Sequence, residues 1–253
     1  MNHKVALITG ASSGIGAELS KTLARDKWNL VLLARRGEIL NNIKKNLVKD
    51  FNIKVEVYPC DINDTEKLQD VIQKAFKKFL HIDLVVLNAG ISDPVPVNKF
   101  NVKKIKEIYE TNVFGALNIV SLILPNLLST KKESHIVGIS SLTAYKAFAK
   151  THPYGASKSA LSAHLEGLRA ELSSTNIRVS TICPGFIKTP MTEKNKFPMP
   201  FLMDVDIACL KIKKAIYNKT PIYNFPWQSY YLLKLSTLLP KKILDLLNKR
   251  IKI

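Results

Sequence analysis

The sequence contains little acidic charge and few cysteines, and it lacks a long uncharged apolar run. Its 20 acidic residues stand against 38 lysines and arginines, which gives a formal net charge of +18. Cys60, Cys183 and Cys209 form no C-x-x-C pair, so we predict neither a disulfide framework nor a metal site. No uncharged apolar run reaches the roughly 18 residues of a membrane span, and we expect no secretory leader before the first apolar strand. We therefore expect a cytoplasmic protein without a metal.

Apolar residues are abundant and regularly arranged. They make up 46% of the 253 residues, enough for the core of one domain that covers 1–253. Short apolar runs alternate with stretches that have apolar residues three or four apart, a pattern typical of parallel strands joined by helices. We predict an α/β, doubly wound, three-layer fold of the Rossmann type with a mainly parallel seven-stranded sheet. The predicted strands are 5–9, 30–34, 54–59, 84–87, 135–140, 178–183 and 221–225.

Three glycines separate the first strand from the first helix. Their spacing is G-x-x-x-G-x-G, in the stretch Gly10-Ala11-Ser12-Ser13-Gly14-Ile15-Gly16. Glycine permits a sharp turn, and a helix that begins there points free N–H groups and a positive dipole end at the turn. We interpret the turn as a phosphate cradle. The alternative is a structural turn that binds nothing.

Two arginines follow the second strand. In a dinucleotide-binding fold this position faces the adenosine ribose, where an acidic residue favours NAD and an arginine accommodates the 2′-phosphate of NADP. Arg35 and Arg36 therefore predict NADP(H) in preference to NAD(H). The alternative is that both guanidinium groups are simply solvated.

Tyr154 and Lys158 lie four residues apart, on one face of a predicted helix. A free tyrosine has a pKa of about 10, too high for efficient proton transfer at neutral pH. A nearby ammonium group stabilises the phenolate and lowers that pKa. The pair therefore suits proton transfer to or from the oxygen of a ketone or an alcohol.

The ordered motifs together resemble the short-chain dehydrogenase/reductase family, in its short single-domain branch. The matching residues run from about residue 5 to 190, and the remaining residues match only loosely. The motifs are Thr9-Gly10-Ala11-Ser12-Ser13-Gly14-Ile15-Gly16, Asp61, Asn88-Ala89-Gly90, Thr111-Asn112-Val113, Ser140-Ser141, Tyr154 with Lys158, and Pro184-Gly185 with Thr189.

The resemblance implies a role for each catalytic residue. Tyr154 would give its proton to the carbonyl oxygen, and Lys158 would lower the pKa of Tyr154 and hold the nicotinamide ribose. Ser141 would orient the substrate oxygen, since it precedes the tyrosine by the family's usual interval, although Ser140 could share this role. Asn112 would anchor a water that relays protons to Lys158.

The resemblance also implies cofactor contacts beyond the glycine turn. Asp61 and Ile62 would lie at the adenine, Asn88, Ala89 and Gly90 at the ribose, and Pro184, Gly185, Ile187 and Thr189 at the nicotinamide. Three alternatives stay open. Asp61 could cap a helix, Asn88 could be purely structural, and Thr189 could cap the following segment.

Two segments depart from the strand–helix pattern. Residues 189–204 are rich in proline, methionine and phenylalanine, and we interpret them as a mobile apolar flap over a substrate rather than an ordinary loop. Residues 227–253 form a basic, amphipathic extension with six lysines and arginines against one aspartate. Two helices there could contact an anionic membrane or pack on the domain or on another subunit.

These observations predict an NADP(H)-dependent oxidoreductase that interconverts a carbonyl and an alcohol on an apolar small molecule. One alternative is a 3-oxoacyl-carrier-protein reductase, since an acidic carrier would suit the basic surface. Another is a membrane-associated protein that senses NADPH, which the complete catalytic set argues against. The resemblance implies a homodimer or homotetramer. Nucleic acid is not expected, because the paired lysines are typical of solvated helix faces.

Overall fold

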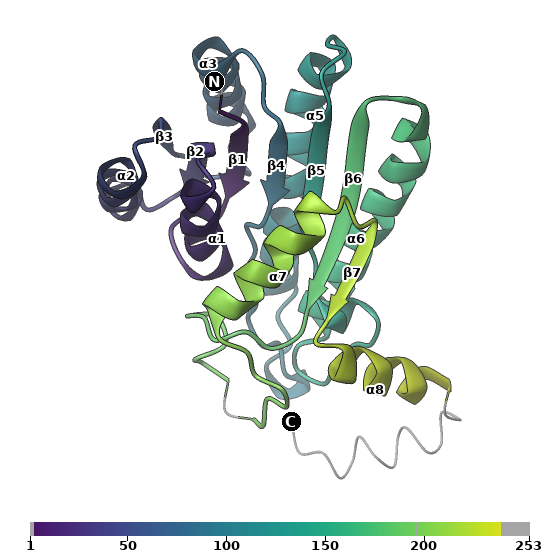
Figure 1. The fold of residues 1–253 in the computed structure, drawn as a ribbon. Helices are drawn as coiled ribbons and strands as arrows, with labels where there is room; N and C mark the ends of the chain where they lie inside the picture. Colours follow the sequence, from purple (N-terminus) through teal and green to yellow (C-terminus); the bar gives the residue numbers. More distant parts are fainter. Residues whose placement is uncertain (1–2, 196, 239–253) are drawn as a thin grey trace.

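Seven strands form a single sheet in which every neighbouring pair is parallel. The computed structural model describes residues 3–195 and 197–238 (Figure 1). The strand order is β3-β2-β1-β4-β5-β6-β7, and each predicted strand ends within one residue of the observed one. The strands are β1 (Val5–Thr9), β2 (Asn29–Ala34), β3 (Val55–Pro59), β4 (Leu84–Leu87), β5 (Ser134–Ile139), β6 (Ile177–Pro184) and β7 (Ile222–Phe225).

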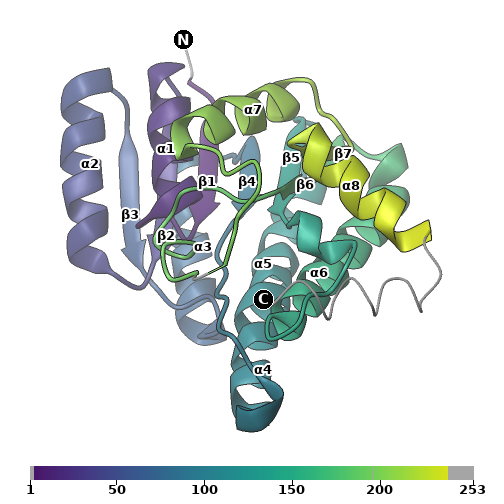
Figure 2. The ribbon, with the colours of Figure 1, turned by 90° about the horizontal axis from the view of Figure 1, so that it is seen from below.

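Helices cover both faces of the sheet, which confirms the predicted three-layer fold (Figure 2). One face carries α1 (Gly14–Arg25), α2 (Gly37–Phe51) and α7 (Val205–Tyr217). The other carries α3 (Thr65–Phe79), α5 (Gly115–Leu128) and α6 (His152–Glu171). Further helical segments are α4 (Val102–Tyr109), α8 (Trp227–Leu238), the π-helical turn η2 (Glu110–Phe114), and the 3-10 turns η1 (Val97–Lys99), η3 (Leu142–Ala144) and η4 (Leu172–Ser174).

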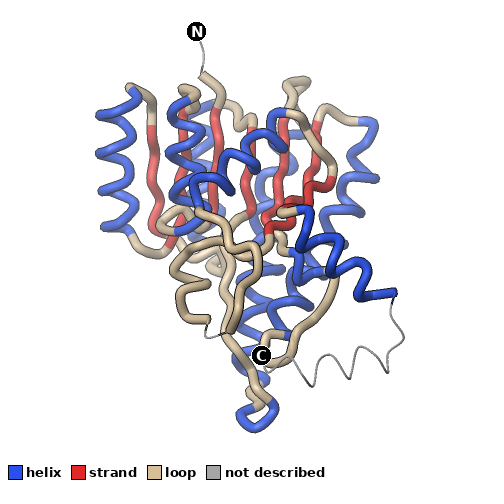
Figure 3. The backbone as a smooth tube through the Cα atoms, turned by 60° about the horizontal axis from the view of Figure 1, so that its bottom comes forward, coloured by secondary structure: helices blue, strands red, loops and turns tan. Residues whose placement is uncertain are grey.

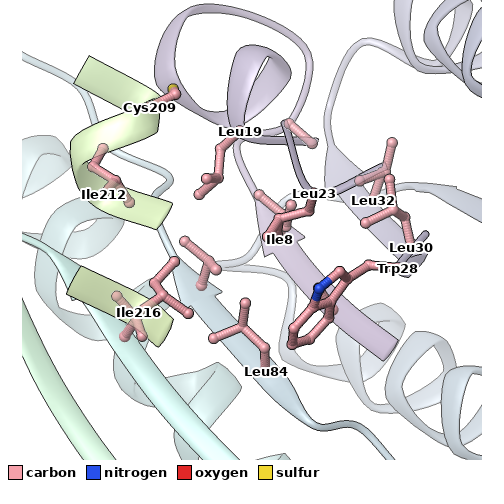
Figure 4. Close-up of a cluster of buried hydrophobic side chains, with 14 of the residues drawn as sticks. Ile8, Leu19, Leu23, Trp28, Leu30, Leu32, Leu84, Cys209, Ile212 and Ile216 are labelled. Carbon is pink, nitrogen blue, oxygen red and sulfur yellow. The ribbon is translucent and has the colours of Figure 1, made fainter. Parts of the chain in front are cut away.

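Alternating strand residues build two separate hydrophobic cores. Successive side chains of a strand point to opposite faces, so Ile8 joins the core beneath α1 and α7 while Leu7 joins the core beneath α3 and α5. Both side chains are fully buried. Trp28 packs beside Leu23 and Ile8 in the first core (Figure 4). Burial on both faces explains why these strands read as continuous apolar runs.

Local side chains set where several helices begin and end. The Asp64 carboxylate accepts a hydrogen bond from the Lys67 amide at 3.1 Å and caps α3. Asn101 caps α4 in the same way through the Lys104 amide, at 3.2 Å. Asn52, with φ of 49°, ends α2 in the left-handed conformation.

The continuous helical segment 102–128 is long and apolar enough, by length and composition, to span a membrane. Pro125 lies inside this helical segment. Its apolar residues pack into the second core, through Ile119, Ile123 and Leu127. The segment is therefore accounted for as a core helix of this fold.

Successive strands are added to one side of β1 up to β3 and to its other side from β4 onward, so β1 lies between β2 and β4. In open parallel sheets, ligands bind outside the carboxyl ends of the strands at such a switch point. Figure 3 shows the loops gathered at this end of the sheet. The extension predicted for 227–253 begins with α8, and its remaining part lies outside the described residues.

Candidate active site

The glycine turn after β1 has a backbone that favours glycine at two positions. Gly10 and Gly14 have φ values of 65° and 54°, in the left-handed region. A Cβ atom on Gly16 would lie 2.4 Å from the Gly10 carbonyl oxygen. The turn therefore leads tightly into α1, whose first N–H groups have no partner within the helix and suit an anion.

Asn88 and Thr9 hold the turn against the end of β4. The Asn88 side-chain amide donates to the Thr9 carbonyl at 2.9 Å. The Thr9 hydroxyl oxygen in turn accepts from the backbone amides of Asn88 and Ala89, each at 3.0 Å. Asn88 thus has the structural role that the sequence left open, and it also lines the cavity described below.

The two arginines after β2 differ in their contacts. The Arg36 guanidinium donates to the Ser12 hydroxyl at 2.8 Å and to the Ser13 hydroxyl at 2.6 Å, so it lies against the glycine turn. Arg35 is mostly exposed, and its guanidinium lies 3.8 Å from the Asp61 carboxylate. Two cations and two hydroxyl groups therefore converge at the carboxyl end of β2.

Asp61 follows β3 and shapes its own loop. Its carboxylate accepts from the Asn63 amide at 3.0 Å. The helix-cap alternative for Asp61 is wrong, because Asp64 caps α3. The neighbouring Ile62 is buried, and its carbonyl accepts from the Asn118 side chain at 3.2 Å.

The α6 helix places Tyr154 and Lys158 on one face, as predicted. The Lys158 ammonium nitrogen lies 5.9 Å from the centre of the Tyr154 ring. The same nitrogen donates to the Ile139 carbonyl at the end of β5, at 2.8 Å. Lys158 is only 4% exposed, so these contacts fix its position between the strand and the phenol.

Asn112 lies in the π-helical turn η2 and is fully buried. Its side-chain oxygen accepts from the Ile91 amide at 2.8 Å, and its side-chain nitrogen donates to the Ile91 carbonyl at 3.0 Å. The same nitrogen donates to the Ser157 hydroxyl on α6, at 3.0 Å. Asn112 thus joins the loop after β4 to the catalytic helix, and the π turn interrupts the regular helix at this residue.

Ser140 and Ser141 have different environments after β5. The Ser140 hydroxyl donates to the Lys158 carbonyl at 3.0 Å and lies 2.7 Å from the Ser162 hydroxyl. The Ser141 oxygen accepts from the amide and the hydroxyl of Thr143, at 3.1 and 2.9 Å. Ser141 can therefore donate its own proton toward the cavity, whereas Ser140 is engaged with α6.

Burial has the largest effect on the pKa values of Tyr154 and Lys158. It raises the pKa of Tyr154 to about 12, and a hydrogen bond to Ser141 acts in the opposite direction. Burial lowers the pKa of Lys158 to about 8. The predicted lowering of the Tyr154 pKa by Lys158 stays a prediction, since the upward shift in this structure comes from loss of water around the phenol.

The loop after β6 closes the remaining side of the site. The Gly185 amide donates to the Phe225 carbonyl at 2.7 Å, and Ile187 is buried. The Thr189 amide donates to the Thr192 hydroxyl at 3.0 Å. The predicted flap is tied at its base, where the Met203 amide donates to the Phe186 carbonyl at 3.0 Å and the Lys188 amide donates to the Met203 carbonyl at 2.9 Å.

A cavity of about 300 Å³ brings nearly all of the predicted residues together. Asn112 and Gly16 lie outside its lining and act through packing and hydrogen bonds. The predicted residues that line it are Gly10, Ser12, Ser13, Gly14, Ile15, Arg35, Arg36, Asp61, Ile62, Asn88, Ala89, Gly90, Ser141, Tyr154, Lys158, Pro184, Gly185, Ile187 and Thr189. Among the described residues, no cluster of three or more histidines, cysteines and acidic residues could hold a metal.

Several lining residues escaped the sequence analysis as site residues. Ile91 and Thr111 lie near the catalytic helix, and Pro190, Met191 and Thr192 come from the flap. The flap prediction was the available signal for these three residues. Thr143 does not line the cavity but holds Ser141, and its position two residues after Ser141 is the only hint that the sequence offers.

Comparison with known proteins decides the family. The family model described as short chain dehydrogenase matches residues 4–198. The chain is a short-chain dehydrogenase/reductase. An uncharacterized oxidoreductase of Myxococcus xanthus is 33% identical over 252 residues, which cover 100% of this chain and 99% of that protein. The ketoacyl reductase HetN of a Nostoc species is 31% identical over 87% of this chain and 77% of its own length.

Solved structures of short-chain dehydrogenases share the fold. One from Burkholderia phymatum, in complex with NAD, has a TM-score of 0.85 at 20% identity and covers 93% of both chains. L-sorbose reductase of Gluconobacter frateurii, complexed with NADPH and L-sorbose, has a TM-score of 0.79 at 23% identity, covering 88% of this chain and 95% of that one. The family supports an enzyme that acts on a CH–OH or C=O group.

The residues of this short-chain dehydrogenase/reductase fit a nicotinamide dinucleotide. Gly10 and Gly14, both in the left-handed region, carry no side chain at the N-terminus of α1, so a pyrophosphate can approach the backbone there. A Cβ atom on Gly14 would lie 3.2 Å from the Thr189 side chain, so the two walls of the cleft are close here. The catalytic phenol lines the same cavity as the turn.

Proposed function

We propose that the protein is an NADP(H)-dependent oxidoreductase that interconverts a ketone or aldehyde and an alcohol. The observation that carries the cofactor assignment is the Arg36 guanidinium, held 2.6 Å from the Ser13 hydroxyl and 2.8 Å from Ser12. A 2′-phosphate placed here accepts hydrogen bonds from both kinds of group. The Asp61 carboxylate, after β3, already faces Arg35.

Tyr154 is the proton donor in the reducing direction. The phenol is protonated at neutral pH at its ordinary pKa and at the raised one alike, so its proton is available to the carbonyl oxygen of the substrate. Ser141 donates a second hydrogen bond to that oxygen and orients it. As the phenol loses its proton, the Lys158 ammonium stabilises the negative charge that develops. A bound nicotinamide supplies the hydride, and the chain supplies orientation and proton transfer.

An apolar substrate suits the walls around the phenol. Ile91, Ile139, Ile187 and Met191 line the cavity together with Pro184. The Phe186 ring, just before the flap, meets the Phe197 ring of the flap edge to face, with 5.9 Å between their centres. These surfaces favour a ketone or aldehyde with an apolar body over a highly charged one.

Paired titration of the protein with NADPH and NADH tests the cofactor assignment. Loss of reduced-nicotinamide absorbance with a panel of apolar ketones, aldehydes and β-ketoacyl thioesters then tests the reaction. We expect tighter binding of NADPH and turnover of one apolar class. Equal binding of both cofactors would overturn the NADP preference, and binding without turnover of any carbonyl would favour a sensor role.

A 3-oxoacyl-carrier-protein reductase is the second candidate. The formal charge of +18 favours an acidic carrier protein, and the relative from Nostoc bears the name ketoacyl reductase. Turnover of a carrier-bound β-ketoacyl thioester much faster than turnover of the free thioester would select this candidate. Equal rates would leave the smaller, unbound carbonyl as the substrate.

A further inference from the structure

The outer face of α8 is apolar and exposed. Four residues recur at a helical spacing along it, Trp227, Tyr231, Leu235 and Leu238, and Leu232 lies beside them. Their exposed fractions range from 55% to 78%. The helix contains no acidic residue, and Lys234 is its one basic residue. Exposed aromatic rings and leucines on one side of a helix suit the boundary between lipid headgroups and acyl chains.

The same edge of the molecule carries more exposed apolar side chains. In the view from below, α8, the flap and the loop before α4 surround the carboxyl ends of the strands (Figure 2). The flap exposes Met191, Phe201 and Leu202, and the loop before α4 exposes Val97 and Phe100. Met191 also lines the catalytic cavity. The flap therefore brings an exposed apolar side chain to the mouth of the active site.

Positive charge accompanies the exposed apolar side chains of this edge. Lys99 lies in the loop before α4 and Lys194 lies in the flap. Lys146 and Lys150 lie in the loop before α6, and Lys188, just before the flap, is paired with Asp204 at 2.7 Å. The sequence that follows α8 adds five lysines and arginines against one aspartate, Asp245. An acidic surface with an apolar interior complements both features, because basic residues near an anionic membrane add to the affinity from apolar burial.

We propose that the rim formed by α8, the flap and the loop before α4 binds the surface of an anionic lipid bilayer. In this orientation the outer face of α8 lies among the lipid headgroups, and the catalytic cavity opens toward the membrane. Entry of substrate from the lipid phase would follow, and that consequence alone rests on the proposed function.

The inner face of α8 is fastened to the loop that carries Ser141. The Tyr145 ring meets the Tyr230 ring edge-on, with 5.4 Å between their centres. The Tyr145 hydroxyl donates to the Asn224 side chain at 3.0 Å, and the Lys146 ammonium donates to the Ser236 hydroxyl at 3.2 Å. These contacts hold α8 against the domain with its apolar stripe turned outward.

Vesicle co-sedimentation of the full-length protein tests the proposal. We expect binding to vesicles of phosphatidylcholine mixed with phosphatidylglycerol, and weaker binding to phosphatidylcholine alone or at high salt. The double variant Leu232→Glu/Leu235→Glu should bind the anionic vesicles about tenfold less tightly or worse, since it replaces two apolar contacts with like charges. NADPH titration of the same variant reports separately on the fold and the cofactor site.

The control variant is Ile39→Glu/Val48→Glu on α2. It makes the same change of charge at two exposed apolar residues, on a helix outside the rim. We expect it to bind vesicles almost as well as the natural protein. Equal loss in both double variants would reduce the effect to net charge and overturn the proposal. The proposal would also be overturned if the natural protein bound no vesicles and light scattering showed an oligomer that dissociates in Leu232→Glu/Leu235→Glu. That result would identify the face as a subunit interface.

Discussion

The Lys158 ammonium nitrogen lies 5.9 Å from the centre of the Tyr154 ring while it donates to the Ile139 carbonyl at 2.8 Å. One hydrogen bond to the end of β5 thus places a buried cation beside the catalytic phenol. The arrangement has an energetic cost, because burial disfavours the charged form of lysine and lowers its pKa to about 8. Placement of a charge where the reaction needs it is a common origin of such costs at active sites.

Replacement of Lys158 by methionine should change how stability depends on pH. The pKa of Lys158 is lowered from 10.5 to about 8 in the folded protein, so the unfolded chain binds the proton more tightly. The natural protein therefore loses stability as the pH falls from 10.5 to 8, by about 3 kcal/mol in all. Lys158→Met removes this loss. Urea denaturation should show its advantage over the natural protein shrinking between pH 7 and pH 10.

The exposed Lys49→Met on α2 is the matched control for that experiment. Its stability relative to the natural protein should change little over the same pH range. A constant difference between Lys158→Met and the natural protein at both pH values would contradict the lowered pKa. Loss of activity in Lys158→Met is expected at every pH, because the ammonium group is absent.

Ser141 and Ser140 should separate in kinetics and stability. Ser141→Ala removes the hydroxyl that faces the substrate oxygen and should lower kcat by about a hundredfold or more. Ser140→Ala removes hydrogen bonds to α6 and should cost about 1 kcal/mol of stability while kcat stays within tenfold. Steady-state kinetics and urea denaturation of both variants check this. A larger kcat effect from Ser140→Ala would reverse the assignment.

The arginines after β2 should discriminate between the two cofactors. Arg36→Gln and Arg35→Asp should each weaken NADPH by about tenfold or more and change NADH much less, because only NADPH carries the 2′-phosphate. Fluorescence titration with both cofactors measures the two dissociation constants. Arg25→Gln, at the far end of α1, controls for the change in net charge. Equal weakening of NADPH and NADH would remove the 2′-phosphate argument.

The positions of the strands could be predicted from the sequence, because burial on both faces gives each strand a continuous apolar run. The order of the motifs located most of the cavity, since the carboxyl ends of parallel strands meet at one edge. Gly16 was assigned to the cofactor, but it lies outside the cavity lining, and the Gly10 carbonyl oxygen beside it leaves no room for a side chain. A motif identifies such a residue but does not show whether it contacts the cofactor or only packs within the turn.

Other features depend on three-dimensional surroundings that a sequence does not display. The upward shift of the Tyr154 pKa follows from loss of water around the phenol, which the sequence does not display. The π-helical turn at Asn112 and the support of Ser141 by Thr143 are local backbone geometries. The apolar character of α8 was expected as part of the extension, but the exposure of that face, and of Met191 at the cavity mouth, required the structure.

The central claim is that Tyr154 donates the proton to the substrate. Its most direct test is the rate at which a substrate carbonyl oxidises bound NADPH in a single turnover. We expect Tyr154→Phe to bind NADPH as the natural protein does and to lose about a hundredfold or more of the rate. Tyr145→Phe makes the same chemical change outside the cavity lining and should keep the rate within tenfold. A Tyr154→Phe protein that still reduces the carbonyl at close to the natural rate would contradict the account.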